Sequence, residues 1–167
     1  AGTIVIPRGT EVTSTVQTVL TGLGLTEVTV NVMPRVLVLT SGHEVIEPGE
    51  SLTPGKIYNS NRAMICGLLE DLGFHKITHY HVSDAPEELE SEINHVLQLS
   101  EEADIIISSG GVSVGLFDTM PLIYEKLGAQ SIYARIQMRP GAASYGAVTP
   151  KGQIIFGLSG NPGAAFN

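Results

Sequence analysis

Residues 104–115 read Asp-Ile-Ile-Ile-Ser-Ser-Gly-Gly-Val-Ser-Val-Gly, and this stretch decides the class of fold. Its first half is a continuous apolar run, which is typical of a strand covered on both faces of a parallel sheet. Its second half is a turn rich in glycine and serine, and a helix is predicted to begin at Asp118. A buried strand that passes through a glycine-rich loop into a helix is the repeating unit of an α/β protein.

The same alternation is predicted on the N-terminal side of this stretch. An apolar strand over 36–39 leads into a long loop and then into a helix over 61–72, for which Ser60 is the expected N-cap. A further strand is expected over 77–82, where apolar and polar residues are mixed.

The pattern continues on both sides of the glycine-rich loop. Asp84 is the expected cap of a helix that begins near Pro86. Beyond residue 118, strands are expected over 132–138, 145–148 and 153–158. A final helix is expected to begin at Asn161. Together these elements predict a three-layer α/β fold with a largely parallel sheet over residues 35–167.

Residues 1–34 differ from the rest. The pattern predicts a short strand over 3–6, a helix over 13–23 and an alternating strand over 26–32. We expect this part to be the tail of a preceding N-terminal region, separate from the α/β domain.

The chain carries a net negative charge. There are 9 Lys and Arg against 17 Asp and Glu, a net charge of −8. A protein that binds duplex nucleic acid needs a basic face, so we expect no nucleic-acid partner. No run approaches the roughly 20 apolar residues of a membrane span. The single cysteine, Cys66, excludes an internal disulfide, and we expect a cytoplasmic protein with no membrane contact.

Residues 111–115 match the G-x-S-x-G pattern of a serine hydrolase, but the context is wrong. Ser113 lies several residues beyond the strand, whereas a nucleophile must sit at the turn from strand to helix. No histidine follows it, because the last one is His95. The same loop lacks the lysine of a Walker A motif, since Leu116 stands at that position.

The five histidines do not predict a metal centre. His79 and His81 share one face of a predicted strand, but a zinc site needs three or four converging ligands. His43, beside Glu44, is the one histidine expected to lie near a functional site. Cys66 is expected to pack in the core.

Ligands of α/β sheets bind at the carboxyl ends of the strands. Glu44 and Asp118 are the acids expected at this edge, and two carboxylates with a phosphate can share a Mg²⁺ ion. The alternatives are that Asp118 only caps a helix and that Glu44 is a solvated loop acid. Four loops are expected to meet there: 40–44, 82–84, 108–115 and 157–162.

Four motifs stand in the order found in one known family. They are residues 35–44, residues 57–62, the loop 108–115 with Asp118, and residues 157–162. Together they resemble the MogA-like domain of MoeA/gephyrin-type molybdopterin molybdenumtransferases. The resemblance extends over residues 35–167, and residues 1–34 resemble the stretch that leads into that domain.

The resemblance implies a reaction and a site. Adenylylated molybdopterin and molybdate would give molybdenum cofactor and AMP, with Mg²⁺ as the metal. The family's functional acids fall on Glu44 and Asp118, which are implied to be catalytic and to hold the metal. The implied substrate-binding residues are Ser41, Gly42, Ser109, Gly110, Gly111, Ser113, Gly115, Arg139, Pro140, Gly141, Ser159, Gly160, Asn161 and Pro162. The implied partners are a molybdopterin adenylyltransferase and, in the full-length protein, a second subunit of a homodimer.

The chain departs from the family pattern at several positions. An acid of the first loop is replaced by His43, and an acid before the helix is replaced by Asn59. Ala142 stands where the family has a lysine of a segment similar to an oxyanion site, although Arg139 keeps one charge there. The loss of a cation weakens the capture of a doubly charged oxyanion. Molybdate binding is therefore the part of the resemblance with the least support.

Two other functions remain open. The same fold could bind a pterin or nucleotide without metal insertion, as in competence- and damage-inducible-type proteins, and the change at Ala142 and Ala143 favours this alternative. A scaffold role, as in gephyrin, has little support, because the chain has no Trp and only 5% aromatic residues. The family also has further domains, so we expect this fragment to fold but to turn over poorly or not at all.

Overall fold

The computed structural model describes residues 2–111 and 119–166. The chain forms two compact units, Ala1–Val32 and Met33–Asn167. Three of the predicted site residues, Ser113, Gly115 and Asp118, lie outside the described residues.

The first unit contains one helix, α1 (Ser14–Gly22), close to the predicted range. The Thr13 hydroxyl caps it by accepting a hydrogen bond from the Val16 N–H. The strands predicted over 3–6 and 26–32 are wrong, since residues 2–32 form no strand. Alternating residues become a strand only where a second strand supplies backbone partners, and this unit offers none among the residues described.

The second unit is built on a six-stranded sheet with the order β4-β1-β5-β8-β7-β6. The first four strands in this order are mutually parallel, whereas β7 runs antiparallel to β8, and β6 to β7. Their bounds are β1 (Val36–Ser41), β4 (Ile77–Val82), β5 (Ile105–Ser109), β6 (Gln130–Tyr133), β7 (Tyr145–Val148) and β8 (Ile154–Leu158). The strand predicted over 132–138 is thus wrong in its extent, because pairing with β7 ends at Tyr133 after an irregularity in register.

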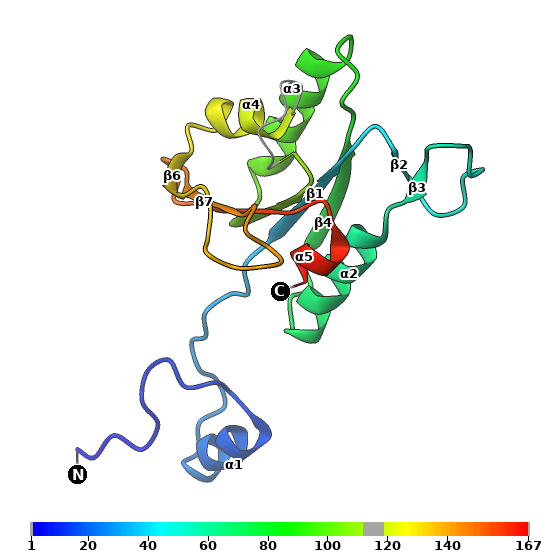
Figure 1. Ribbon diagram of the computed structural model, residues 1–167. Helices are drawn as coiled ribbons and strands as arrows, with labels where there is room; N and C mark the ends of the chain where they lie inside the picture. The colour runs from blue at the N-terminus through cyan, green and yellow to red at the C-terminus, as the bar shows by residue number, and fades with distance from the viewer. Residues whose placement is uncertain (1, 112–118, 167) are drawn as a thin grey trace. The chain divides into compact units, whose positions relative to one another are not determined.

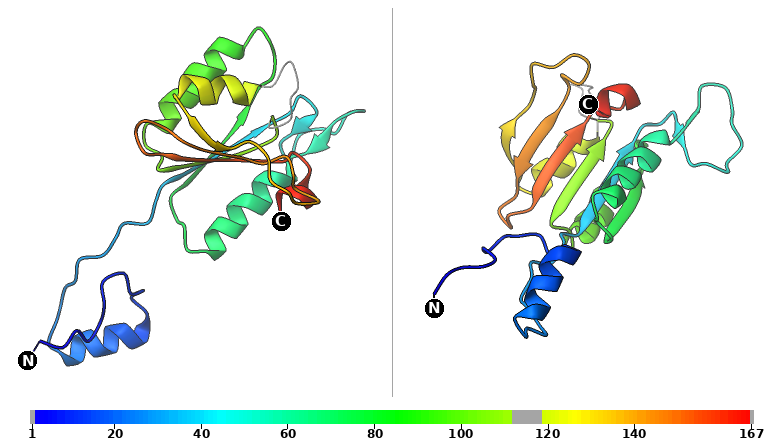
Figure 2. Two further views of the ribbon diagram at one scale, coloured as in Figure 1. Left: turned by 60° about the vertical axis from the view of Figure 1, so that its left-hand side comes forward. Right: turned by 90° about the horizontal axis from the view of Figure 1, so that it is seen from below.

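Helices cover both faces of the sheet, so the predicted three-layer α/β fold is confirmed (Figure 1; Figure 2). Val36 and Val38 of β1 pack in one core cluster with α2 (Ser60–Asp71). Leu37 and Leu39 pack on the opposite face in a larger cluster with α3 (Leu89–Ser100) and α4 (Thr119–Lys126). Alternate residues of one fully buried strand therefore support two separate helix layers.

Two of the predicted helix starts are wrong. Asn59, not Ser60, caps α2, and its Oδ1 accepts from the Arg62 N–H at 3.1 Å. Asp84 caps no helix, because α3 begins only at Leu89. At α2 the neighbouring Asn59 supplies the cap instead of Ser60. At α3 the Asp84 carboxylate accepts a hydrogen bond from Thr119 Oγ1, and Glu88, which precedes the helix, makes no side-chain cap hydrogen bond.

The long loop after β1 has structure of its own. Residues 45–46 (β2, Val45–Ile46) pair in parallel with β3 (Ile57–Tyr58) to form a small second sheet. Figure 1 shows this arm standing away from the six-stranded sheet. After β8, the short helix α5 (Pro162–Ala165) begins where Asn161 predicted it. Over the part of the chain that the structure describes, no helix has the length and apolarity to cross a membrane.

Candidate functional site

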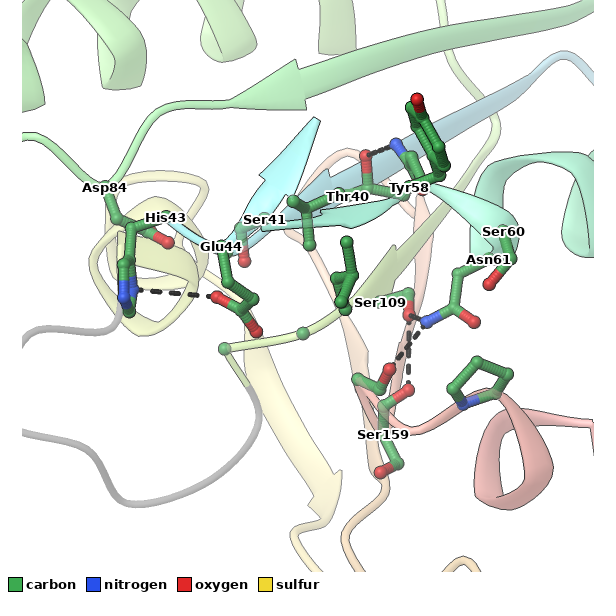
Figure 3. A pocket seen from close by; sticks show the side chains of 18 of the residues that line it. Thr40, Ser41, His43, Glu44, Tyr58, Ser60, Asn61, Asp84, Ser109 and Ser159 are labelled. Carbon is green, nitrogen blue, oxygen red and sulfur yellow. Dashed lines mark hydrogen bonds and ion pairs between the residues drawn. The ribbon is translucent and has the colours of Figure 1, made fainter. Parts of the chain in front are cut away.

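A cleft of about 370 Å³ lies at the carboxyl ends of the parallel strands. The loops that follow β1, β4, β5 and β8 all contribute to it, as expected for a ligand site of a parallel sheet. The segment from β3 into α2 closes one side (Figure 3). Of the predicted site residues, the cleft is lined by Ser41, Gly42, Glu44, Ser109, Gly110, Gly111, Ser159, Gly160 and Pro162.

Glycines at the end of β5 allow the loops to approach closely. Gly110 has a φ of +91°, and a Cβ atom there would lie 2.6 Å from the Ser41 carbonyl oxygen. Gly111 has a φ of +63°, and its Cβ would lie 2.8 Å from Met120 Cγ. Only glycine combines this backbone conformation with this spacing. At Gly110 and Gly111 the cleft is therefore lined by backbone without side chains, against which a ligand can pack closely.

Asn61 of α2 ties two of these loops together. Its Nδ2 donates to Ser109 Oγ at 2.7 Å and to the Gly160 carbonyl oxygen at 2.8 Å. Ser109 Oγ in turn donates to the Ser159 carbonyl oxygen at 3.2 Å. The contact with a carbonyl sets the orientation of the amide, because only the NH₂ group can donate there. Asn61 is not among the site residues predicted from the sequence, although its position two residues after the cap Asn59, within the motif 57–62, is a usable signal.

The charged groups lining the described cleft are acidic. Glu44 is about half exposed, and its Oε2 lies 3.6 Å from His43 Nδ1. Asp84 supplies a second carboxylate, whose Oδ1 accepts from Thr119 Oγ1 at 3.1 Å. No lysine or arginine lines the cleft among the residues described. An anionic ligand would therefore need backbone N–H groups or a bound cation to offset its charge.

A polar network stands behind the wall formed by Thr40 and Asn59. Asn59 Nδ2 donates to Thr40 Oγ1 at 2.9 Å and to Glu47 Oε1 at 2.8 Å. Arg62 Nη1 donates to Glu47 Oε2 at 2.6 Å. Burial raises the pKa of Glu47, but the hydrogen bonds from Asn59 and Arg62 outweigh it and hold the pKa below its usual value. The network thus keeps a carboxylate ionised between the arm and α2.

His79 takes part in the same network. Its Nε2 lies 3.0 Å from Thr40 Oγ1. Burial, and then the positive charge of Arg62, lower the pKa of His79 to about 4, although Glu47 opposes the shift. This histidine is therefore neutral at physiological pH.

Several predicted site residues do not line the cleft. Arg139, Pro140 and Gly141 lie outside it, and a Cβ at Gly141 would lie 3.1 Å from the Ala164 carbonyl oxygen of α5. Asn161 is used as a helix cap, with its Oδ1 accepting from the Gly163 N–H at 3.0 Å. The roles proposed for these residues remain predictions.

No group of three or more His, Cys, Asp or Glu side chains that could hold a metal occurs within residues 2–111 and 119–166. Mg²⁺ is compatible with this, because it commonly takes one or two carboxylates together with water and phosphate oxygens. Glu44 has the exposure and the place in the cleft for such a role.

Comparison with known proteins shows the family to which this fold belongs. Residues 37–167 match a family model described as "Probable molybdopterin binding domain". The match covers most of the chain, so the chain belongs to this family of molybdopterin-binding domains.

Individual relatives are more specific. The molybdopterin molybdenumtransferase of Staphylococcus epidermidis is 39% identical over 170 positions, which cover 99% of this chain and 39% of that protein. A solved molybdopterin biosynthesis MoeA protein of Pyrococcus horikoshii superimposes with a TM-score of 0.68 at 28% identity, over 90% of this chain and 36% of that one. The molybdopterin biosynthesis Mog protein of Mycobacterium ulcerans shares the fold, with a TM-score of 0.55 at 18% identity, over 81% and 86% of the two chains. The chain spans about two fifths of the length of the curated relatives it matches.

Proposed function

We propose that this chain is the molybdopterin-binding part of a molybdopterin molybdenumtransferase, an enzyme of molybdenum cofactor biosynthesis. The observation that carries the proposal is the agreement over nearly the whole chain with curated relatives of that name. The proposed reaction inserts molybdate into adenylylated molybdopterin and releases AMP. The proposed substrate site is the cleft at the carboxyl ends of β1, β4, β5 and β8.

The cleft offers open backbone and hydroxyl groups to a phosphate-bearing ligand. Gly110, Gly111 and Gly160 leave the backbone open, and Ser41 and Ser109 add hydroxyl groups at its edge. Glu44 is the proposed holder of a Mg²⁺ ion, with Asp118 as the proposed second carboxylate. When bound, such an ion offsets the charge of phosphate and departing AMP. Asp84 adds a second acidic group to the cleft, which disfavours a bare anion there.

The proposed partners follow from the reaction. A molybdopterin adenylyltransferase would supply the adenylylated substrate, and the whole protein would act as a homodimer in the cytoplasm. Both are proposals for the longer protein, of which this chain corresponds to a part.

A second function has one observation in its favour. Ala143 lines the cleft, and no lysine or arginine does so among the described residues. A cleft without a cation can bind a pterin or nucleotide through hydrogen bonds yet fail to hold molybdate. The chain would then be a binding domain without metal insertion.

The test uses the whole protein that carries this chain, supplied with adenylylated molybdopterin and Mg²⁺. AMP release is measured with and without molybdate for the unmodified protein, Glu44→Gln and Asp118→Asn. Glu125→Gln is the matched control, because Glu125 is an exposed acid of α4 outside the cleft. Molybdate-dependent release that falls at least about a hundredfold in the first two variants, and not in the control, supports the proposal.

One other outcome would reject it. Tight pterin binding without AMP release would favour the binding domain. Molybdate-dependent release that both substitutions leave unchanged would keep the proposed reaction and remove Glu44 and Asp118 from the proposed site.

A further inference from the structure

The hydroxyl group of Thr40 lies between two histidines of the neighbouring strand. Thr40 Oγ1 is 3.0 Å from His79 Nε2 and 3.1 Å from His81 Nδ1. It also accepts a hydrogen bond of 2.9 Å from Asn59 Nδ2. Both histidines are half-buried on β4, which pairs with β1 so that Thr40 lies opposite His81. The hydroxyl is thus engaged by three groups at once.

Counting hydrogens restricts the state of both rings. A threonine hydroxyl has one hydrogen to donate and two lone pairs that accept. Asn59 occupies one lone pair, so one imidazole must donate to the hydroxyl and the other must accept from it. If His79 Nε2 accepts, His81 donates from Nδ1, and both rings carry a hydrogen on Nδ1. In the reverse arrangement, both rings carry it on Nε2.

We propose that His79 and His81 are positioning residues of the cleft, which share one tautomer and hold Thr40 and Asn59 in place through the Thr40 hydroxyl. Thr40 and Asn59 both line the cleft. The inference deepens the proposed function and rests on it, because the wall that the histidines hold belongs to the proposed substrate site.

The charges around the pair favour this arrangement. Arg62 from α2 and Glu47 from the segment after β2 face His79, and His81 is its neighbour on β4. Glu47 is already paired with Arg62 and Asn59, so little negative charge is left to stabilise an imidazolium. Two protonated rings would make three donors, with Asn59, to a hydroxyl with two lone pairs, and one of the three contacts would be lost. At least one ring must therefore stay neutral for the wall to keep its form.

The first experiment needs no ligand. Long-range ¹H–¹⁵N spectra of the labelled chain at pH 7.5 report which nitrogen of each imidazole carries the hydrogen. We expect His79 and His81 to show the same tautomer. At pH 5.5 an imidazole with a pKa of 6.5 is about 90% protonated, and one with a pKa of about 4 is about 3% protonated. We expect His79 to remain neutral at that pH. Opposite tautomers at pH 7.5, or two charged rings at pH 5.5 with the contacts to Thr40 retained, would overturn the proposal.

The second experiment tests positioning, with AMP and Mg²⁺ as the probe. His79→Leu removes the contact, and we expect AMP to bind at least tenfold more weakly. The double variant His79→Gln with His81→Asn puts amide groups where Nε2 and Nδ1 lie, without a titrating ring, and should restore the affinity to within about threefold. His75→Gln is the matched control, because His75 is exposed and lies outside the cleft. A melting temperature recorded for each variant shows whether the fold is retained.

The two experiments separate two kinds of failure. If AMP does not bind the unmodified chain, the cleft is not a nucleotide site in this chain, while the tautomers still decide whether the pairing exists. If AMP binds and His79→Leu leaves its affinity unchanged, the pair does not position the cleft, and the inference is wrong.

Discussion

Replacing Gly110 by alanine tests whether the close approach of the strand-end loops is required. The substitution has two costs. A φ of +91° is unfavourable for a residue with a Cβ, by about 1–2 kcal/mol. The new Cβ would also lie 2.6 Å from the Ser41 carbonyl oxygen and 3.0 Å from Ser41 Oγ. Since the first of these atoms is backbone, β1 or the loop must shift, at a cost of about 1–3 kcal/mol. The expected loss of unfolding free energy is about 2–5 kcal/mol.

Gly152 provides the matched control. Its φ is +82°, but nothing lies within 4 Å of the position of its Cβ. Gly152→Ala therefore carries the conformational cost alone, about 1–2 kcal/mol. The difference between the two variants isolates the contact with Ser41, and it should amount to at least about 1 kcal/mol.

Urea unfolding followed by tyrosine fluorescence measures both variants. All five tyrosines lie beyond residue 33, so the signal reports the α/β unit. The slope of the unfolding free energy against urea concentration should stay unchanged, because the folded unit remains compact. Equal losses for Gly110→Ala and Gly152→Ala would refute the reasoning that the loops touch at Gly110.

Three further predictions concern buried or bridging groups. In the folded chain the pKa of His79 is about 4, below its ordinary value of 6.5. Between pH 6.5 and pH 4 the unfolded chain therefore binds more protons than the folded chain, and the free energy of unfolding should fall as the pH drops through this range. At 1.36 kcal/mol per pKa unit the shift corresponds to about 3.4 kcal/mol, which screening by solvent reduces to about 1–2 kcal/mol for a half-buried ring. Urea titrations at several pH values test it, since His79→Gln should lose this part of the pH dependence of stability. Gln153→Ala leaves two carbonyl groups without their donor and should cost about 2–4 kcal/mol, whereas the exposed Gln98→Ala should cost under about 0.5 kcal/mol in the same titration. Asn61→Ala removes the hydrogen bonds that hold two loops of the cleft, and it should weaken AMP binding at least tenfold, as measured by calorimetry. If the variant binds AMP as tightly as the unmodified chain does, Asn61 does not hold the cleft in its binding form.

The apolar runs allowed the main strands to be predicted because burial on both faces of a strand is a local property of composition. Residues 36–39 and 105–107 are strands in the structure, and β1 is buried along its whole length. The position of the cleft agrees with the same pattern, since the carboxyl ends of parallel strands share one edge of a sheet. Ser41, Glu44 and Gly110 accordingly line one cleft.

Predictions that depended on a partner far along the chain were less successful. The alternating residues 26–32 form no strand, because alternation does not reveal whether a neighbouring strand exists. Asp84 has the sequence context of a helix cap, yet it accepts a hydrogen bond from Thr119, 35 residues away. A local pattern cannot distinguish these two partners for one carboxylate.

The α/β class, the core strands and the loops around the cleft were predictable from the sequence, since these depend on hydrophobic periodicity and on residues with special backbone freedom. The side chains that contact one another across the cleft are known only from the folded chain. Asn61 reaches Ser109 and Gly160, which are 48 and 99 residues away. Thr40 meets two histidines that the sequence placed on a separate strand. Such contacts exist only after sheet order and strand register bring distant loops and strands together, and neither is encoded in any single stretch of the chain.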